Sequence, residues 1–332
     1  MQRNNSIDSL KALCAFLIVV LHCTIVGKGY IVPLTRLAVP CFFIISGWFI
    51  YSSDKGKMQS KLLKSARRMC WLIAWSTLLF ASKKLLIAYR HHDFSFINWT
   101  SVWKFVILNE NPFGFHLWYL GAYLYVLMIV WSLSRVHKEK LLKIITPPLL
   151  LTDLLLGKYS VLILGTEFPV VYVRNFLFVG IPFFTIGMWL REKEGFVIRD
   201  GMRNMSAAIV LLFCMTTLLE KYFLVTHDCN ATQDHYLSST FLAIAVFLFF
   251  VNTQSANETG MSKVGRNDSL YIYILHPIFF SFFSVINGHL PDEWNTIYSY
   301  TAPVMVFGIT CIFSKTLRVV IKRFKLISQP LR

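Results

Sequence analysis

The stretch from Ile7 to Cys23, IDSLKALCAFLIVVLHC, decides how this chain folds. It is apolar enough for a membrane helix, yet it carries Asp8, Lys11 and His22. Lys11 and His22 are eleven positions apart, and at 100° per residue both side chains return to one helix face. The rise per residue separates them by roughly 16 Å along the axis. We therefore expect Lys11 near a membrane surface and His22 deeper in the hydrocarbon.

His22 is the residue of this stretch that most clearly indicates function. An ionisable side chain inside a membrane helix is costly, and it usually faces a protein-lined cavity where it has a role. The plain alternative is a neutral imidazole that hydrogen-bonds a neighbouring helix. Asp8 and Lys11 are weaker signals, because charges at a helix end often mark the interface and pair with each other.

The composition places the chain among membrane proteins. Of its 332 residues, 55% are hydrophobic, 16% aromatic and only 15% charged. This is too apolar for a soluble protein of this length, so we predict an all-α polytopic membrane protein. About ten apolar segments of spanning length are expected to surround a polar central cavity: 10–28, 33–51, 69–89, 116–133, 144–163, 174–190, 205–223, 237–252, 269–288 and 300–317.

The basic residues predict the orientation of these segments. The net charge of +16 is interleaved with the spans, so it indicates topology and not nucleic-acid binding. By the positive-inside rule both termini are cytoplasmic, in a multi-pass protein of the cell (inner) membrane. Most lysines and arginines fall in the even-numbered connections and the tail: Lys55, Lys57, Lys61, Lys64, Arg67, Arg68, Arg135, Lys138, Lys140, Lys143, Arg191, Lys193, Arg199, Arg203, Lys263, Arg266, Lys315, Arg318, Lys322, Arg323, Lys325 and Arg332.

The third predicted span begins with a basic cluster. Lys64 and Arg67 are three residues apart and share a helix face, with Arg68 next to them. Such a cluster is either an ordinary positively charged flank or a clamp for phosphate oxygens. The seven cysteines lack paired CxxC spacing, so we expect neither a disulfide framework nor a metal site.

Polar residues recur in most of the other spans, which is typical of helices around a polar cavity. In the second span, Pro40 is expected to free a backbone carbonyl, and Ser46-Gly47 to permit close helix approach. Arg36, at the outer end of that span, either faces the cavity or extends to the interface. The remaining polar positions lie at the outer ends of the fourth and sixth spans and inside the seventh and ninth: His116, Trp118, Arg174, Asn175, Glu220, Tyr273 and His276.

Several of these segments together resemble acyltransferase family 3, polytopic membrane O-acyltransferases that modify cell-surface glycans, lipopolysaccharide and related acceptors. The matching pieces are IDSLKALCAFLIVVLH, RLAVPCFFIISGW, KSARR, HLWYL, RNFLFVGIPFFTIG and SLYIYILHP, in that order along the chain. The resemblance implies one membrane domain over residues 1–332 without an appended soluble domain. The family's first helix carries an arginine, ten residues and then an essential histidine; here Lys11 replaces the arginine and His22 matches the histidine.

The resemblance also implies the reaction. Acetyl-CoA, or another short acyl-CoA, is the expected cytoplasmic donor, and no metal is expected. Its phosphates would bind Lys11 and the family's Arg-x-x-Arg positions, which here are Lys64 and Arg67, with Arg68 able to serve instead. His22 would act as general base on an acceptor hydroxyl or would accept the acyl group itself.

The expected acceptor is a glycan or a lipid-linked sugar, bound at an outer entrance. That entrance is expected to contain Arg36, His116, Trp118, Arg174 and Asn175. Candidates for orienting His22, unranked by the sequence, are Glu220, Tyr273 and His276. Two other readings stay open: a membrane transporter of a small polar substrate, and a non-catalytic partner of other surface-polymer assembly proteins.

Overall fold

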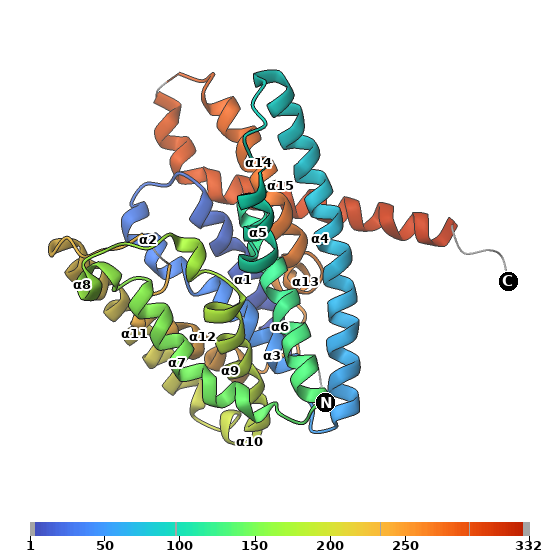
Figure 1. The fold of residues 1–332 in the computed structure, drawn as a ribbon, viewed down its shortest axis with the longest axis vertical. Coiled ribbons are helices and arrows are strands. Elements are labelled where there is room, and N and C mark those ends of the chain that lie inside the picture. The colour runs from blue at the N-terminus through green and yellow to red at the C-terminus, as the bar shows by residue number, and fades with distance from the viewer. Residues whose placement is uncertain (1–3, 97, 233, 292, 328–332) are drawn as a thin grey trace. The chain divides into compact units, whose positions relative to one another are not determined.

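The protein is helical throughout the described residues, and the computed structural model contains no strand among them (Figure 1). These residues are 4–96, 98–232, 234–291 and 293–327, with 321–327 described by their backbone. The tail residues Lys322, Arg323, Lys325 and Arg332 therefore lie outside the described side chains. The helices form two compact units, residues 1–38 with 253–332, and residues 39–252.

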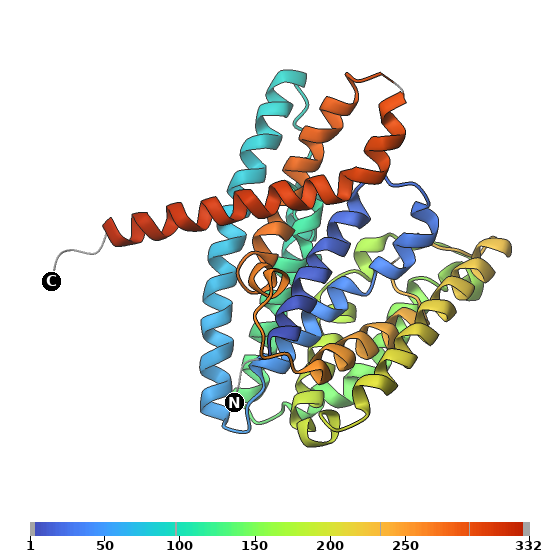
Figure 2. The same ribbon diagram turned by 180° about the vertical axis from the view of Figure 1, so that it is seen from behind.

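The first unit joins the two ends of the chain. Its helices are α1 (Asn5–His22), α2 (Lys28–Thr35), α13 (Gly260–Asn267), α14 (Ser269–Asn287) and α15 (Glu293–Ile327). Figure 2 shows α15, in red, beside α14, in orange. Edge-to-face ring contacts hold α15 against both neighbours, Phe16–Phe307 to α1 and Phe279–Phe313 to α14.

The second unit contains the middle of the chain. Its longest element is α4, which extends well beyond the apolar segment predicted there. The helices of this unit are α3 (Ala38–Ile50), α4 (Lys55–His91), α5 (Trp99–Leu108), η1 (Phe115–Leu117), α6 (Trp118–Arg135), α7 (Lys140–Leu156), α8 (Ser160–Leu164), η2 (Val170–Tyr172), the π-helix η3 (Phe176–Gly180), α9 (Ile181–Glu192), α10 (Glu194–Val197), α11 (Met202–Thr226) and α12 (Leu237–Thr253).

Each of the ten predicted apolar segments coincides with helix, but not all are long enough to span. Among the described residues, seven helical segments have the length and composition to cross a membrane. The fifth, sixth and eighth predicted spans correspond to α7, η3 with α9, and α12, and these are shorter; α7 and α12 have 17 residues each. The membrane character of the chain is thus supported, whereas the count of ten is not established.

Two local expectations need correction. The first helix does not continue to residue 28; it ends at His22, where the N–H of Cys23 bonds the Val19 carbonyl. The second span is interrupted between α2 and α3, at residues 36–37, and not at Pro40. Pro40 lies in the first turn of α3, where a missing N–H costs no helical hydrogen bond.

The Ser46-Gly47 pair does allow close helix packing, as predicted. A β-carbon at Gly47 would lie 2.0 Å from the Phe184 carbonyl oxygen of α9, and one at Gly187 would lie 2.1 Å from the Ile44 oxygen of α3. Each helix therefore presents a glycine to the other's backbone. This reciprocal contact fixes the crossing of α3 and α9.

We expect Gly47→Ala to lower the melting temperature of the detergent-purified protein. The added methyl group would force α3 and α9 apart, and overpacking of this kind costs about 1–3 kcal/mol. Gly56→Ala is the matched control, because its new β-carbon would meet nothing closer than 3.4 Å. Tryptophan fluorescence follows the thermal unfolding of both variants. Equal melting temperatures for the two variants would contradict the close packing of α3 against α9.

Candidate functional site

His22 lies beside a second histidine in the first unit. The ring centres of His22, at the end of α1, and His276, in α14, are 5.1 Å apart and the planes are inclined by 33°. His22 is exposed in the isolated chain, whereas His276 is fully buried. Two imidazoles joined by an N–H···N bond of about 3 Å have centres about 5 Å apart. The two rings are therefore in contact, while the Nε2 atom of His276 makes no hydrogen bond among the described residues.

The sequence His276-Pro277 determines which nitrogen of His276 carries a proton. Proline has no N–H, so the Tyr273 carbonyl, four residues earlier, lacks its usual helical donor. The Nδ1 atom of His276 lies 2.8 Å from this oxygen and 3.1 Å from the Ile272 oxygen. Because a carbonyl only accepts, Nδ1 must be the protonated nitrogen. In the neutral ring, Nε2 is then the acceptor, and the helix backbone fixes the ring's orientation.

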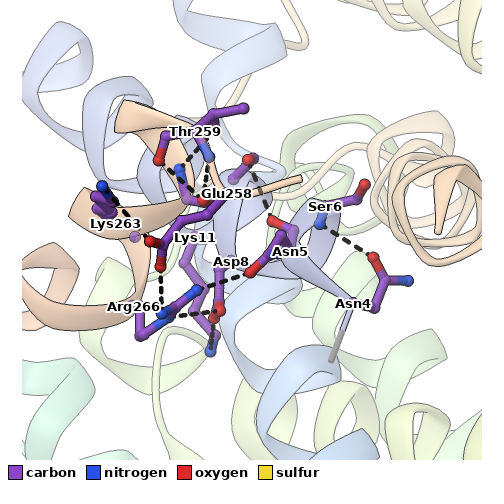
Figure 3. Close-up of polar contacts among 12 residues, drawn as sticks. Asn4, Asn5, Ser6, Asp8, Lys11, Glu258, Thr259, Lys263 and Arg266 are labelled. Carbon is purple, nitrogen blue, oxygen red and sulfur yellow. Dashed lines mark hydrogen bonds and ion pairs between the residues drawn. The ribbon is translucent and has the colours of Figure 1, made fainter. Parts of the chain in front are cut away.

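A buried ion-pair network surrounds the other end of α1 (Figure 3). Asp8 is 2% exposed; its carboxylate accepts from Lys11 Nζ at 2.9 Å and from Arg266 Nε in α13 at 3.2 Å. Arg266 also bonds Asn5 Oδ1 at 2.7 Å and Glu258 Oε1 at 2.6 Å. Lys11 therefore shares a carboxylate with Arg266, and 23% of its side chain stays exposed.

A close backbone approach brings this network together. A β-carbon at Gly265 would lie 1.7 Å from the Asp8 carbonyl oxygen, so only glycine lets α13 lie this close to α1. The segment before α13 is tied to the start of α1 by the N–H of Asn5, which bonds the Ser255 oxygen, and by the Asn5 side chain on the Ala256 oxygen. The network therefore anchors the first helix.

The predicted anion clamp lies in the second unit. Lys64, Arg67 and Arg68 are exposed on α4. The nearby Tyr123 hydroxyl of α6 interacts with the side chains of Ser46 and Ser65. The three basic residues are thus available to an anion, but no ligand-shaped cavity around them is described.

The predicted outer entrance is partly assembled in the same unit. The Arg174 guanidinium lies over the rings of Phe115, at 4.2 Å, and Trp118, at 5.7 Å, and pairs with Asp234 at 3.0 Å. His116, between the two aromatic residues in sequence, packs edge-to-face on Phe80 of α4. Arg174 and Trp118 are therefore in contact, and His116 lies two residues before Trp118 in the chain.

Asn175 is next to this cluster but serves the backbone. Its side-chain oxygen accepts from the N–H groups of Leu177 and Phe178, and its amide nitrogen donates to the Tyr172 oxygen at 2.8 Å. These bonds cap the π-helix η3. Arg36 is half-buried in the other unit, where it ends α2.

A cavity of about 100 Å³ adjoins the entrance cluster. Leu117 contributes to its wall, together with the polar side chains of Thr77, Asn109 and Tyr125. Asn109 is 2% exposed, and its amide nitrogen has no hydrogen-bond partner among the described residues. Its oxygen accepts from the Phe176 N–H at 3.3 Å, which links the cavity to η3. The sequence analysis did not single out Asn109, although the polar run NENP from 109 to 112 was a signal.

Glu220 finds the partners that a carboxylate within a span requires. It accepts from the N–H groups of Leu237 and Ser238, at 2.9 and 3.0 Å, and from the hydroxyls of Ser238 and Tyr159. It therefore caps the N-terminus of α12. A second buried pair, missed by the sequence analysis, joins Asp153 and His235 at 3.0 Å.

Comparison with known proteins gives two matches. The acyltransferase domain family matches residues 4–317, which is most of the chain and includes parts of both units. The serine/alanine racemase of Enterococcus gallinarum is 23% identical over 314 residues, covering 88% of this chain and 38% of that protein. The chain thus spans about two fifths of that relative's length. No solved structure matches this chain.

Proposed function

The chain belongs to acyltransferase family 3, and from this premise we propose that it is a membrane O-acetyltransferase. It moves an acetyl group from cytoplasmic acetyl-CoA, or another short acyl-CoA, to a hydroxyl of a surface glycan or of its lipid-linked precursor. It does so in the cell membrane, with both termini in the cytoplasm. The observation that carries this proposal is the pairing of His22 with a second, oriented imidazole.

His22 is the general base of the proposed reaction. It takes the proton of the acceptor hydroxyl as the oxygen attacks the thioester carbonyl. The tetrahedral intermediate then collapses, the carbon–sulfur bond breaks, and the imidazolium returns the proton to the departing thiolate. The products are the O-acetyl ester and CoA, and His22 regains its starting state.

His276 is a positioning residue in this scheme. With Nδ1 held on the Tyr273 carbonyl, its Nε2 is left as an acceptor beside His22. In the reacting state this Nε2 would accept an N–H from His22 and leave the other nitrogen of His22 as the base. Of the three orienting candidates, His276 therefore ranks first. Tyr273 assists through its backbone oxygen, and Glu220 is committed to the start of α12.

We expect Pro277→Ala to lower kcat about tenfold with little change in KM for acetyl-CoA. The alanine N–H would satisfy the Tyr273 carbonyl and release the His276 ring, so that His22 loses its fixed partner. Alanine is also the better helix former, so the variant should melt no lower than the wild type. Pro303→Ala, in α15, is the matched control. Unchanged kcat in Pro277→Ala would contradict the positioning role.

The basic residues bind the donor in this proposal. Lys64, Arg67 and Arg68 hold CoA phosphates, since guanidinium groups bind phosphate oxygens in pairs and lysine adds a point charge. Lys11 contributes through the part of its side chain that Asp8 leaves exposed.

The outer cluster binds the acceptor. Trp118 offers an aromatic face, and His116 and Arg174 offer polar groups. The unpartnered Asn109 amide beside the 100 Å³ cavity supports a ligand rich in hydroxyls, because such a ligand would satisfy that donor. The name of the serine/alanine racemase includes serine. The serine hydroxyl is chemically suitable, so serine belongs among the acceptors to be assayed.

An assay with labelled acetyl-CoA tests the proposal. The purified protein is incubated with acetyl-CoA and with glycan, lipid-linked sugar or serine acceptors, and both free thiol and labelled ester are measured. We expect thiol release that depends on an acceptor. Uptake of a small polar solute into vesicles, without thiol release under any condition, would instead support the transporter reading.

A further inference from the structure

A pocket of about 180 Å³ lies in the second unit, lined by residues that the proposed reaction does not use. It is formed where three segments meet: residues 51–58 before and within the start of α4, residues 139–143 at the start of α7, and residues 185–192 of α9. The charge pattern predicts that the connections joined to all three segments are on the cytoplasmic side. Segments that form one pocket must lie at the same membrane face, and this pocket agrees with that prediction.

The charges in this pocket leave a surplus of one cation. Lys55 pairs with Glu139 at 2.9 Å, and Lys143 pairs with Glu192. Burial raises the pKa of Glu139, but hydrogen bonding from Lys55 and from the backbone, and the nearby positive charge, lower it by more, so the carboxylate is ionised at neutral pH. Lys140 has no ion-pair partner among the described residues. The pocket therefore favours an anion.

Two buried polar atoms of the pocket have no hydrogen-bond partner among the described residues, the hydroxyl oxygen of Thr185 and the Oε2 atom of Glu139, so a ligand here needs an acceptor oxygen and an O–H donor, as a singly protonated phosphate has. The Thr185 side chain is 4% exposed, and its hydroxyl has no partner in the described part of the chain. Thr146 of α7, by contrast, bonds the carbonyl four residues before it. A buried donor without an acceptor costs about 1–3 kcal/mol, which a ligand oxygen would recover. The N-terminus of α7, whose Glu139 cap makes no side-chain cap bond, adds its positive dipole end.

The volume limits what the ligand can be. Sites for drug-sized ligands measure about 300–1,000 Å³, so this pocket holds a group and not an entire coenzyme. Phosphate and diphosphate fit, because each presents several acceptor oxygens and negative charge to lysine, hydroxyl and helix N-terminus. A carboxylate would use fewer of these donors.

We propose that this pocket binds the phosphate or diphosphate group of a cytoplasmic ligand through Lys140, Thr185 and the start of α7. The group belongs either to a coenzyme A thioester or to the head group of an anionic phospholipid. Binding of the phosphate is independent of the transfer reaction, so this inference stands or fails separately from the proposed function.

Calorimetric titration of the full-length protein in detergent with inorganic pyrophosphate tests this inference. We expect saturable binding that weakens about tenfold or more in Lys140→Ala and in Thr185→Val, which keeps the shape of the side chain but removes the donor. Lys138→Ala, in the same connection, and Thr185→Ser, which keeps the hydroxyl, should bind like the wild type. Melting temperatures equal to that of the wild type establish that the variants are folded. If Thr185→Val is not folded, the binding affinity of Lys140→Ala alone decides the test.

Absence of saturable pyrophosphate binding, or wild-type affinity in Lys140→Ala, overturns the proposal. Competition identifies the source of the phosphate. Displacement of pyrophosphate by CoA identifies the coenzyme, and displacement by phosphatidylglycerol nanodiscs but not by CoA identifies the lipid head group. Displacement by neither overturns the assignment to these ligands.

Discussion

Replacing His22 with alanine is expected to remove acyl transfer while the protein still inserts and folds. Loss of a general base lowers kcat about 10²–10⁴-fold, which brings a slow membrane enzyme close to background. His22 is exposed at the last residue of α1, so its truncation leaves no buried cavity and little effect on stability is expected. The measurement is acceptor-dependent thiol release by wild type and variant at equal amounts of folded protein.

His289→Ala is the matched control for this experiment. His289 is also exposed, follows α14 in the same unit, and its ring bonds the Val285 carbonyl. We expect it to keep full activity. Wild-type activity in His22→Ala would reject His22 as the base and with it the mechanism proposed for this family member.

An experiment on the wild-type protein without acceptor separates the two roles that the sequence leaves open for His22. If the imidazole accepts the acyl group, wild-type protein mixed with acetyl-CoA alone should release one equivalent of thiol and retain a labelled acetyl group. If His22 is a general base, thiol release requires the acceptor. We expect the second result, because a ring held by His276 is positioned for proton transfer.

The periodicity of the first helix predicted part of the site, because helical geometry is local. One apolar stretch is enough to place Lys11 and His22 on a single helix and to leave the pairing of Lys11 with Asp8 open as the plain alternative to a functional role. The sequence does not predict the partners of that helix, since they come from the other end of the chain. It presents Arg266 only as a topology signal and does not rank His276 among the three candidates for orienting His22.

Glu220 and Pro277 show why the remaining features were missed. The sequence showed that a carboxylate within a span needs a partner, but its partners are backbone N–H groups at the start of α12, which no side-chain pattern reveals. Pro277 removes one backbone donor from α14, yet the helix continues, because the neighbouring histidine donates to the carbonyl that proline leaves without its N–H. Both features depend on backbone groups, whose positions follow from packing.

Asp8→Asn is expected to give the largest loss of stability among the polar substitutions considered. The change leaves Lys11 and Arg266 beside a neutral amide, with only Glu258 to offset them. Breaking a fully buried ion pair costs about 3–5 kcal/mol, and because 23% of each cationic side chain is exposed we expect a smaller loss here, about 2–3 kcal/mol. The close approach of α13 at Gly265 prevents the cations from moving away easily.

Glu258→Gln is the control that separates burial from charge. Glu258 touches the same arginine, but 42% of its side chain is exposed, so its loss should lower the melting temperature much less than the loss of Asp8 does. Thermal unfolding in detergent measures the stability of both variants. The double variant Asp8→Asn with Arg266→Gln measures the coupling between Asp8 and Arg266. We expect the double variant to be more stable than the sum of the single losses predicts, because it removes the unpaired cation together with its partner. Equal losses for Asp8→Asn and Glu258→Gln would show instead that the network is an ordinary surface charge cluster and that α1 is anchored by its apolar contacts alone.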